Sequence, residues 1–102
     1  MNQAQMLAQI RRMQEQMAKA QEELADTVLT GSAAGGTVEV DMSGEFRVKG
    51  VRIKKEAIDP EDAETLEDLL VVAINDAVAK VQELSGKKMG ALTGGLRIPG
   101  LM

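Results

Sequence analysis

Acidic side chains gather in one run of this 102-residue sequence, where they could serve general acid–base chemistry or bind a divalent cation. Residues 56–68 hold acidic groups and no Lys or Arg. A Ca²⁺ or Mg²⁺ site needs oxygen ligands at an organised spacing, and this run has none. Carboxylates are also favoured in the first turn of a helix, where the helix dipole is positive. We therefore interpret residues 61–68 as a solvated helix start and predict no metal site and no cofactor.

The residue types on which most enzymes rely are absent from the chain. It has no Cys and no His, which removes the thiol nucleophile, the commonest general base and the commonest zinc ligand. The glycines at 31–36 and 90–95 do not fit the phosphate-binding pattern G-x-x-x-x-G-K-[ST]. The seven methionines could form an adaptable binding surface or a metal site, but flexible packing along a helix is favoured. The sequence thus argues against an enzyme.

The net charge of −4 hides a strong segregation of charge along the chain. Residues 1–20 and 45–55 are net basic, whereas residues 21–44 and 56–68 carry only acidic charges. An acidic average argues against nucleic acid wrapping the whole molecule. It leaves room for a local basic face, which is what contact with phosphates requires. The cations of the two basic segments are Arg11, Arg12, Lys19, Arg47, Lys49, Arg52, Lys54 and Lys55.

Two long helices are predicted, one towards each end of the chain. In residues 3–26, apolar residues recur at spacings of four and three, which is typical of the narrow seam of a coiled coil. A second helical stripe begins after Asp59, a suitable N-cap, and Pro60, and continues to Gly90. That helix would have about 29 residues and a length of roughly 43 Å, more than one such chain can cover. Either the stripe continues onto a partner chain, or the basic end projects beyond the core.

The residues between the helices predict a small antiparallel sheet. Val38, Val40 and Met42 alternate with polar residues, as in a strand with one apolar face. Val28 and Leu29 would lead a further strand before the glycine-rich residues. Two or three strands between two long helices give an α+β fold.

A hairpin and a β-bulge are expected after the strand at residues 38–42. Ser43–Gly44 is a signal for a two-residue hairpin. Phe46 and Val48 would continue one apolar face, and the parity then shifts before Val51. One extra residue near Lys49–Gly50, a β-bulge, is the simplest explanation of that shift.

The chain is expected to form one domain, residues 1–90, with a flexible C-terminal tail, residues 91–102. No run of about 18 apolar residues indicates a membrane span. The N-terminal residues are polar and lack the pattern of a secretory signal. We therefore expect a cytoplasmic protein.

Several short strings follow one another in an order that is typical of a known family. The most specific are Leu66-Glu67-Asp68-Leu69 and Ala73-Ile74-Asn75-Asp76-Ala77. With these strings the sequence, over about residues 3–95, resembles the YbaB/EbfC family of bacterial nucleoid-associated proteins. The other matching strings are Met13-Gln14-Glu15-Gln16-Met17, Gln21-Glu22-Glu23-Leu24, Leu29-Thr30-Gly31-Ser32, Val38-Glu39-Val40, Ile58-Asp59-Pro60 and Lys88-Met89.

The resemblance implies a helix, three antiparallel strands and a second helix, assembled into a tweezer-like homodimer with projecting helices. It also implies binding to duplex DNA in the bacterial nucleoid, mainly through phosphates, with bending, compaction or protection of the DNA and modulation of gene expression. No small-molecule substrate is expected. The residues that would contact DNA are Arg11, Arg12, Lys19, Lys80, Lys87 and Lys88.

The sequence departs from the family pattern in its strands. Glu39 and Asp41 stand where relatives often carry Lys and a neutral residue, and Lys54–Lys55 precede an Ile-Asp-Pro triplet that is delayed to 58–60. Basic charge is thereby moved to Arg52 and its neighbours, which offer an alternative contact surface.

A different class of function is also consistent with the residues. The projecting helices could grip a partner protein, which would make the chain an interaction adaptor. Loss of binding to any duplex DNA as salt rises would separate DNA binding from this alternative.

Overall fold

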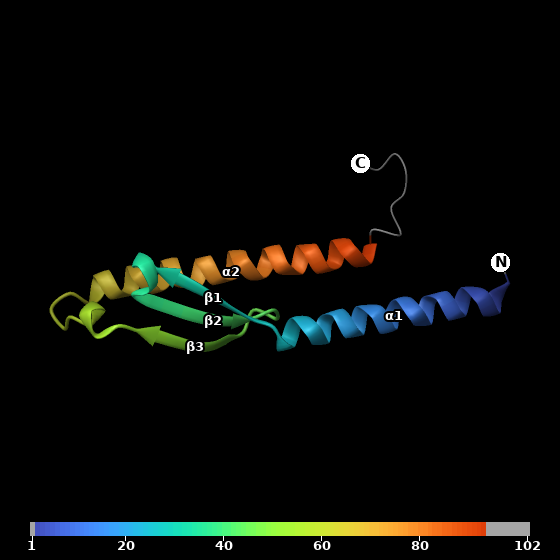
Figure 1. Ribbon diagram of the computed structural model, residues 1–102, viewed down its shortest axis with the longest axis horizontal. Helices are drawn as coiled ribbons and strands as arrows, with labels where there is room; N and C mark the ends of the chain where they lie inside the picture. The colour runs from blue at the N-terminus through green and yellow to red at the C-terminus, as the bar shows by residue number, and fades with distance from the viewer. Residues whose placement is uncertain (1, 94–102) are drawn as a thin grey trace, which may run out of the picture.

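The computed structural model describes residues 2–93 of the chain. It has the predicted α+β architecture, with a helix, a three-stranded antiparallel sheet and a second helix (Figure 1). The elements in chain order are α1 (Gln3–Asp26), β1 (Val28–Ala33), the 3₁₀ turn η1 (Ala34–Gly36), β2 (Val38–Ser43), β3 (Val48–Ile53), the 3₁₀ turn η2 (Lys55–Ala57) and α2 (Ala63–Thr93).

The sheet has the order β1-β2-β3, and its central strand supplies the core. Val38, Val40 and Met42 of β2 are buried, which confirms the predicted alternation. The register between β2 and β3 shifts between the pairs Asp41–Gly50 and Met42–Val48. Lys49 is therefore the extra residue of a β-bulge, at the predicted position.

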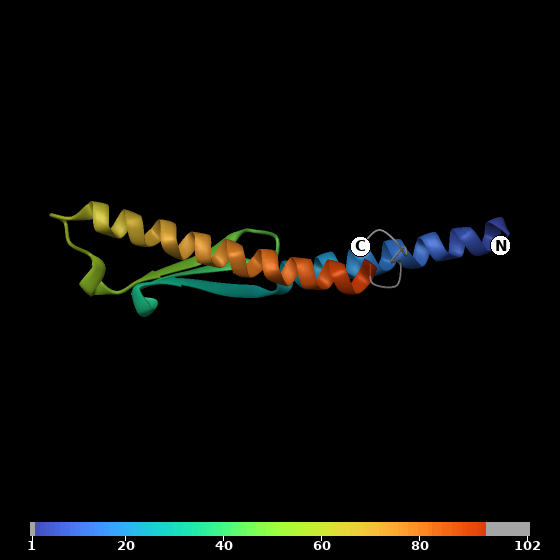
Figure 2. The same cartoon turned by 90° about the horizontal axis from the view of Figure 1, so that it is seen from above.

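α2 covers one face of the sheet over β1 and β2 and leaves β3 uncovered (Figures 1 and 2). Its buried side chains, Ala73, Ala77 and Val81, are small and lie one turn apart. They let the helix backbone approach β1 so closely that a Cβ at Gly31 would clash with the backbone of Ala73 and Ala77. This contact explains why a glycine stands in the middle of a strand.

α1 projects from the sheet as an arm (Figure 1). It begins with a capping box, in which the Asn2 side chain accepts from the Gln5 N–H and the Gln5 side chain accepts from the Asn2 N–H. Only Ala20 and Leu24 of this helix are buried. The backbone of Leu24 lies against Gly44, where a Cβ would clash. The Cα radius of gyration is 19.8 Å and the longest extent 70 Å, against about 13 Å for a compact chain of this size.

The predicted hairpin forms between β2 and β3, but its two-residue turn and the predicted position of Phe46 were wrong. Residues 44–47 form a four-residue connection between β2 and β3. Phe46 has a φ of 63° and is exposed in this connection, so it does not extend the apolar face of a strand. Gly44 is the first residue of this connection. Its backbone N–H donates to the carbonyl of Leu24 at 2.9 Å, and this hydrogen bond ties the turn to α1.

The predicted limits of the second helix also need correction. α2 begins at Ala63, because the Asp62 carboxylate caps it by accepting from the Thr65 N–H at 3.3 Å and the Thr65 hydroxyl at 2.6 Å. The predicted cap, Asp59, instead closes the preceding turn by accepting from the Glu61 N–H. At the other end α2 continues past Gly90 to Thr93. The rest of the predicted tail, residues 94–102, lies outside the described residues.

Candidate nucleic-acid interface

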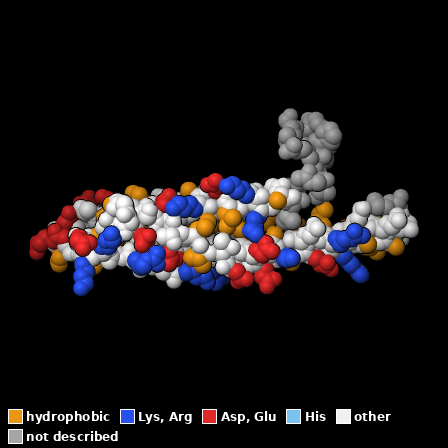
Figure 3. Space-filling model, in the orientation of Figure 1, with side chains coloured by type: hydrophobic (Ala, Val, Ile, Leu, Met, Phe, Trp, Pro, Cys, Tyr) orange, Lys and Arg blue, Asp and Glu red, His pale blue; other side chains and the backbone are white. Residues whose placement is uncertain are grey.

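The cations of α1 take part in none of the ion pairs found within residues 2–93. Arg11, Arg12 and Lys19 are exposed on α1, and none of them forms an ion pair with another residue of the described range 2–93. Arg11 and Arg12 are about 100° apart around the helix and flank the apolar seam. Figure 3 shows Lys and Arg side chains on this projecting part of the molecule. The guanidinium groups are therefore free to meet an anionic ligand.

The three α2 cations predicted to bind DNA all have partners. Lys80 donates to the Thr30 carbonyl at 2.8 Å and lies 3.2 Å from the Asp76 carboxylate. Their positions differ, since Lys80 reaches back to the sheet whereas the other two lie near the end of α2. The other pairs are Lys87 with Glu83 at 3.2 Å and Lys88 with Glu23 at 2.7 Å.

The junction of the two helices brings together two of the predicted residues. The Lys88 ammonium donates to Glu23 of α1, and Lys19 acts on the same carboxylate electrostatically. The hydrogen bond from Lys88, followed by the charges of Lys88 and Lys19, holds the pKa of Glu23 below its ordinary value. This contact ties the end of α2 to α1, at the point where the arm leaves the rest of the molecule.

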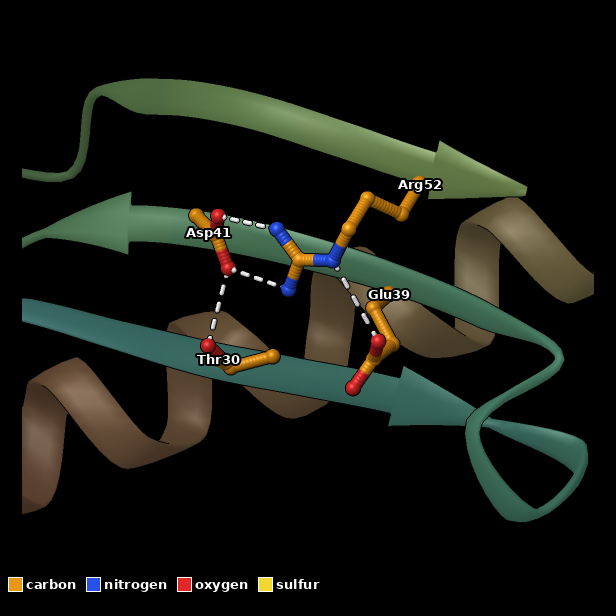
Figure 4. A network of polar contacts seen from close by, with 4 residues as sticks. All are labelled: Thr30, Glu39, Asp41 and Arg52. Carbon is orange, nitrogen blue, oxygen red and sulfur yellow. Dashed lines mark hydrogen bonds and ion pairs between the residues drawn. The ribbon is translucent and has the colours of Figure 1, made fainter. Parts of the chain in front are cut away.

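Arg52 on the sheet is held by a network on the face opposite α2 (Figure 4). Its guanidinium makes two bonds to the Asp41 carboxylate, at 2.5 and 2.9 Å, and one to Glu39 at 3.3 Å. The Thr30 hydroxyl donates to Asp41 at 2.8 Å. The hydrogen bond from Arg52, and then that from Thr30, lowers the pKa of Asp41. The two carboxylates raise the pKa of Arg52.

This network neutralises the charge of Arg52 on β3. Glu39 lies directly opposite Arg52 in the antiparallel register, and Asp41 is its diagonal neighbour. The two departures from the family pattern on β2 are therefore matched by the cation on β3. The network was missed in the sequence because the pairing of Glu39 with Arg52 depends on the length of the connection between β2 and β3, which was predicted as two residues and has four.

Lys54 and Lys55, which follow β3, lie beside negative charge. Lys54 and Lys55 are exposed at the end of the sheet away from the arm, where the chain enters α2 (Figure 1). Acidic side chains gather at the same end of the molecule (Figure 3), including Glu56, Asp59 and Glu61. Their field opposes phosphate binding there, so the arm is the better-placed basic surface.

Residues 2–93 hold neither a cluster of metal ligands nor a membrane-spanning helix. In residues 2–93 no three or more acidic side chains gather as metal ligands would. None of the helices in the same range combines the length and hydropathy needed to cross a bilayer.

An apolar surface remains open between α2 and β3. Val48 and Val51 pair with Met42 and Val40, so they point towards the α2 side of the sheet, yet about half of each is exposed. Asp76 contacts β1 through the Ser32 N–H at 2.9 Å, so the opposite flank of α2 faces β3. That flank carries Val71 and Ile74, which are 56% and 38% exposed. We call Val48, Val51, Val71 and Ile74 the α2–β3 apolar face.

The fold and surface define an extended α+β protein with a projecting helix that exposes Arg11 and Arg12. Comparison with known proteins identifies its family. Residues 1–96 match the YbaB/EbfC DNA-binding family, and the chain belongs to this family. It is a family of DNA-binding proteins and not of enzymes, as the sequence analysis expected.

Relatives and a solved structure agree with this assignment. The chain is 50% identical over 97 residues to a nucleoid-associated protein of Chloroflexus aurantiacus, with 95% of this chain and 97% of the relative covered. It is 42% identical over 100 residues to a nucleoid-associated protein of Pelotomaculum thermopropionicum, with 98% and 95% covered. An uncharacterized protein of Helicobacter pylori has the same fold, with a TM-score of 0.75, 24% identity and coverage of 95% and 99%.

Proposed function

We propose that this protein binds duplex DNA through its phosphates, as a homodimer whose two α1 arms hold the duplex, and that it acts in the bacterial nucleoid. The observation that carries the proposal is the pair Arg11 and Arg12, which are exposed on a projecting helix and form no ion pair within residues 2–93. Family membership supplies DNA binding, and the relatives named above are nucleoid-associated. Lys19, farther along α1, would extend the same contact.

The α2 cations contribute less in this proposal. Lys80, Lys87 and Lys88 must each leave a carboxylate, or share it, before they can meet a phosphate. An exposed ion pair is worth only about 0–1 kcal/mol, so DNA can compete for these cations. Arg52 has two carboxylates beside it, and its net contribution would be smaller still.

Dimerisation through the α2–β3 apolar face supports this function. A contiguous apolar surface of this kind marks an interaction site more often than an ordinary surface. A second copy would bury the face in both chains, since a twofold contact presents the same patch twice. The dimer doubles the number of arms, and two arms on one duplex can bend, compact or protect it and thereby modulate gene expression.

The DNA proposal is tested by the salt dependence of binding. Each phosphate contact contributes about 0.9 to the slope of log affinity against log salt. Replacing Arg11 and Arg12 by Ala in both chains should therefore flatten that slope by up to about 3.6. The loss should be similar on duplexes of any sequence, with helicity and dimer mass unchanged. Gel-shift titrations at several salt concentrations measure it.

A double variant of Lys54 and Lys55 to Ala is the matched control. It removes the same charge from the far end of the sheet, and we expect a smaller loss of affinity. A single Arg52→Ala change should also cost little. If the three sheet cations prove necessary while Arg11 and Arg12 are dispensable, the strands and not the arms contact DNA.

The dimer is tested by Ile74→Asp. A buried, unpaired carboxylate in the contact is costly, so we expect a mass of one chain, or insoluble protein, where the wild type has the mass of two. Val72→Asp on the opposite flank of α2, where Val72 is 54% exposed, is the matched control and should leave the mass unchanged. A wild-type mass of one chain up to millimolar concentration would refute the dimer. Light scattering after size exclusion decides between these results.

The second candidate function is that of an adaptor that binds another protein. It is favoured by one observation, the exposed apolar side chains along α1, which include Leu7 and Ile10. Binding to a protein through that seam would depend weakly on salt and would survive replacement of Arg11 and Arg12. Binding to DNA would not.

A further inference from the structure

The apolar seam of α1 is covered at one end and open at the other. Its last two members, Ala20 and Leu24, are 6% and 5% exposed. The preceding members are 41–50% exposed, although they continue the same line along the helix. We call these residues the open seam; they are Met6, Ile10, Met13 and Met17.

The cover over the closed end is the last part of α2. Ala91 and four α1 residues line one shallow surface groove; the four are Gln16, Lys19, Ala20 and Glu23. Figures 1 and 2 show the end of α2 beside α1, with both helices extending in the direction of the N-terminus. α2 ends at Thr93, so the cover stops where the open seam begins.

The chain does not stop there. Nine residues of the sequence follow Thr93, and they include the apolar side chains Leu96, Ile98, Leu101 and Met102. We propose that residues 96–102 dock on the open seam of their own chain and so continue the cover that α2 begins. The proposal goes beyond DNA binding and does not rest on it.

The length of the segment fits the surface. Met17 and Met6 are separated by eleven residues of helix, or roughly 16 Å at 1.5 Å per residue. Nine extended residues span up to about 30 Å. The segment can therefore run along the whole open seam without reversing its direction. Gly94 and Gly95 stand between α2 and the apolar residues, where glycine favours the end of a helix.

The chemistry of the rim also fits an extended segment of the same chain. Gln9, Gln14 and Gln16 border the open seam, and their side-chain amides can donate to and accept from an extended backbone. They carry no charge that would repel Arg97, the one charged residue of the segment. Arg11 and Arg12 flank the seam and would remain uncovered, so a docked segment leaves the proposed DNA contact accessible.

Docking would also change the arm itself. A single helix without tertiary packing is marginally stable in water, and residues 3–17 are all exposed. A segment lying on the seam would hold this part of α1 helical and fix its direction. The rigidity of the arm would then depend on the end of the chain.

Disulfide trapping tests the proposal, because the chain has no Cys and two introduced thiols are unambiguous. The test pair is Ile10→Cys with Ile98→Cys. The control pair is Ala8→Cys with Ile98→Cys, because Ala8 lies one half-turn around α1 at nearly the same height. Under mild oxidation we expect a disulfide within one chain to form at least tenfold faster for the test pair. Non-reducing gels separate it from a disulfide between chains.

Two outcomes overturn the proposal. Equal rates for the two pairs would mean that the segment samples both sides of α1, as the flexible tail expected from composition would. Fast formation of a disulfide between chains would mean that the segment docks on a second copy. Should a cysteine variant fail to fold, a chain truncated after Thr93 gives an independent measurement. Its amides in residues 6–17 should exchange hydrogen at least tenfold faster than in the full chain, and unchanged exchange refutes docking.

Discussion

The body of the molecule, formed by α2 and the sheet, and its arm, residues 3–17 of α1, use similar apolar spacing in different ways. In the body the stripe contains Ala73, Ala77 and Val81, which are fully buried. Their small size lets α2 lie close against β1. In the arm the stripe contains Met and Ile side chains that remain about half exposed. Periodicity predicts a helix in both regions, but only the size and surroundings of the apolar residues show which helix is packed.

The body and the arm also differ in whether their cations form ion pairs. In the body, Arg52, Lys80 and Lys88 each meet a carboxylate within 3.2 Å. In the arm, Arg11 and Arg12 have no such partner among the described residues. These three cations of the body join strands and helices, whereas Arg11 and Arg12 are exposed on the arm without such a contact. Binding of a phosphate to the two arginines therefore breaks no existing ion pair.

The largest expected difference is in the stability lost when a side chain of the α1 seam is shortened in the body or in the arm. Leu24→Ala removes a side chain that is 5% exposed where α1 joins the body, and buried Leu→Ala changes cost about 2–5 kcal/mol. Met13→Ala in the arm, where Met13 is 41% exposed, should leave the unfolding of the body nearly unchanged. Thermal unfolding followed by circular dichroism measures both. Equal losses would show that the arm is packed as tightly as the junction.

A smaller effect is expected from close backbone contact in the body. Gly31→Ala places a Cβ against the backbone of α2, and the resulting shift should cost about 1–3 kcal/mol. Gly86→Ala is the matched control, since no atom lies within 4 Å of its added Cβ and Ala favours a helix by about 0.5–1 kcal/mol. The urea concentration at half unfolding should therefore fall for Gly31→Ala and rise for Gly86→Ala. A neutral Gly31→Ala would mean that α2 does not sit tightly on β1.

Most of the fold follows from local patterns in the sequence. The limits of α1, the buried face of β2 and the β-bulge at Lys49 were all predicted, because each depends on residues close together in the chain. The two errors have different causes. α2 starts late because Asp62, a second local cap, is used in place of Asp59. The error at Phe46 has a tertiary cause, because it lies in a connection that Gly44 anchors to Leu24.

The candidate site was predictable only in part. Arg11 and Arg12 could be chosen from the sequence because the residues nearest to them on α1 are mostly uncharged. The partners of Lys80 and Lys88 could not, since Thr30 and Glu23 are 50 and 65 residues away in the chain. Which cations are neutralised depends on how α2 lies over the sheet and beside α1. A list of basic residues therefore overestimates the surface available to DNA.

The smallest expected effect is the loss of stability at acidic pH, which should depend on carboxylates of the body and not on those of the arm. Hydrogen bonds from the Ser32 N–H and then from Lys80 lower the pKa of Asp76, and Arg52 does the same for Asp41. A lowered pKa in the folded state stabilises the protein above the ordinary pKa near 4, and this stability is lost as the pH falls through the lowered value. The melting temperature should therefore drop below about pH 4. Asp76→Asn should weaken this dependence of the melting temperature on pH, whereas Glu15→Gln on the arm should preserve it. A wild-type melting temperature that is constant from pH 5 to about 2 would contradict the role of these carboxylates.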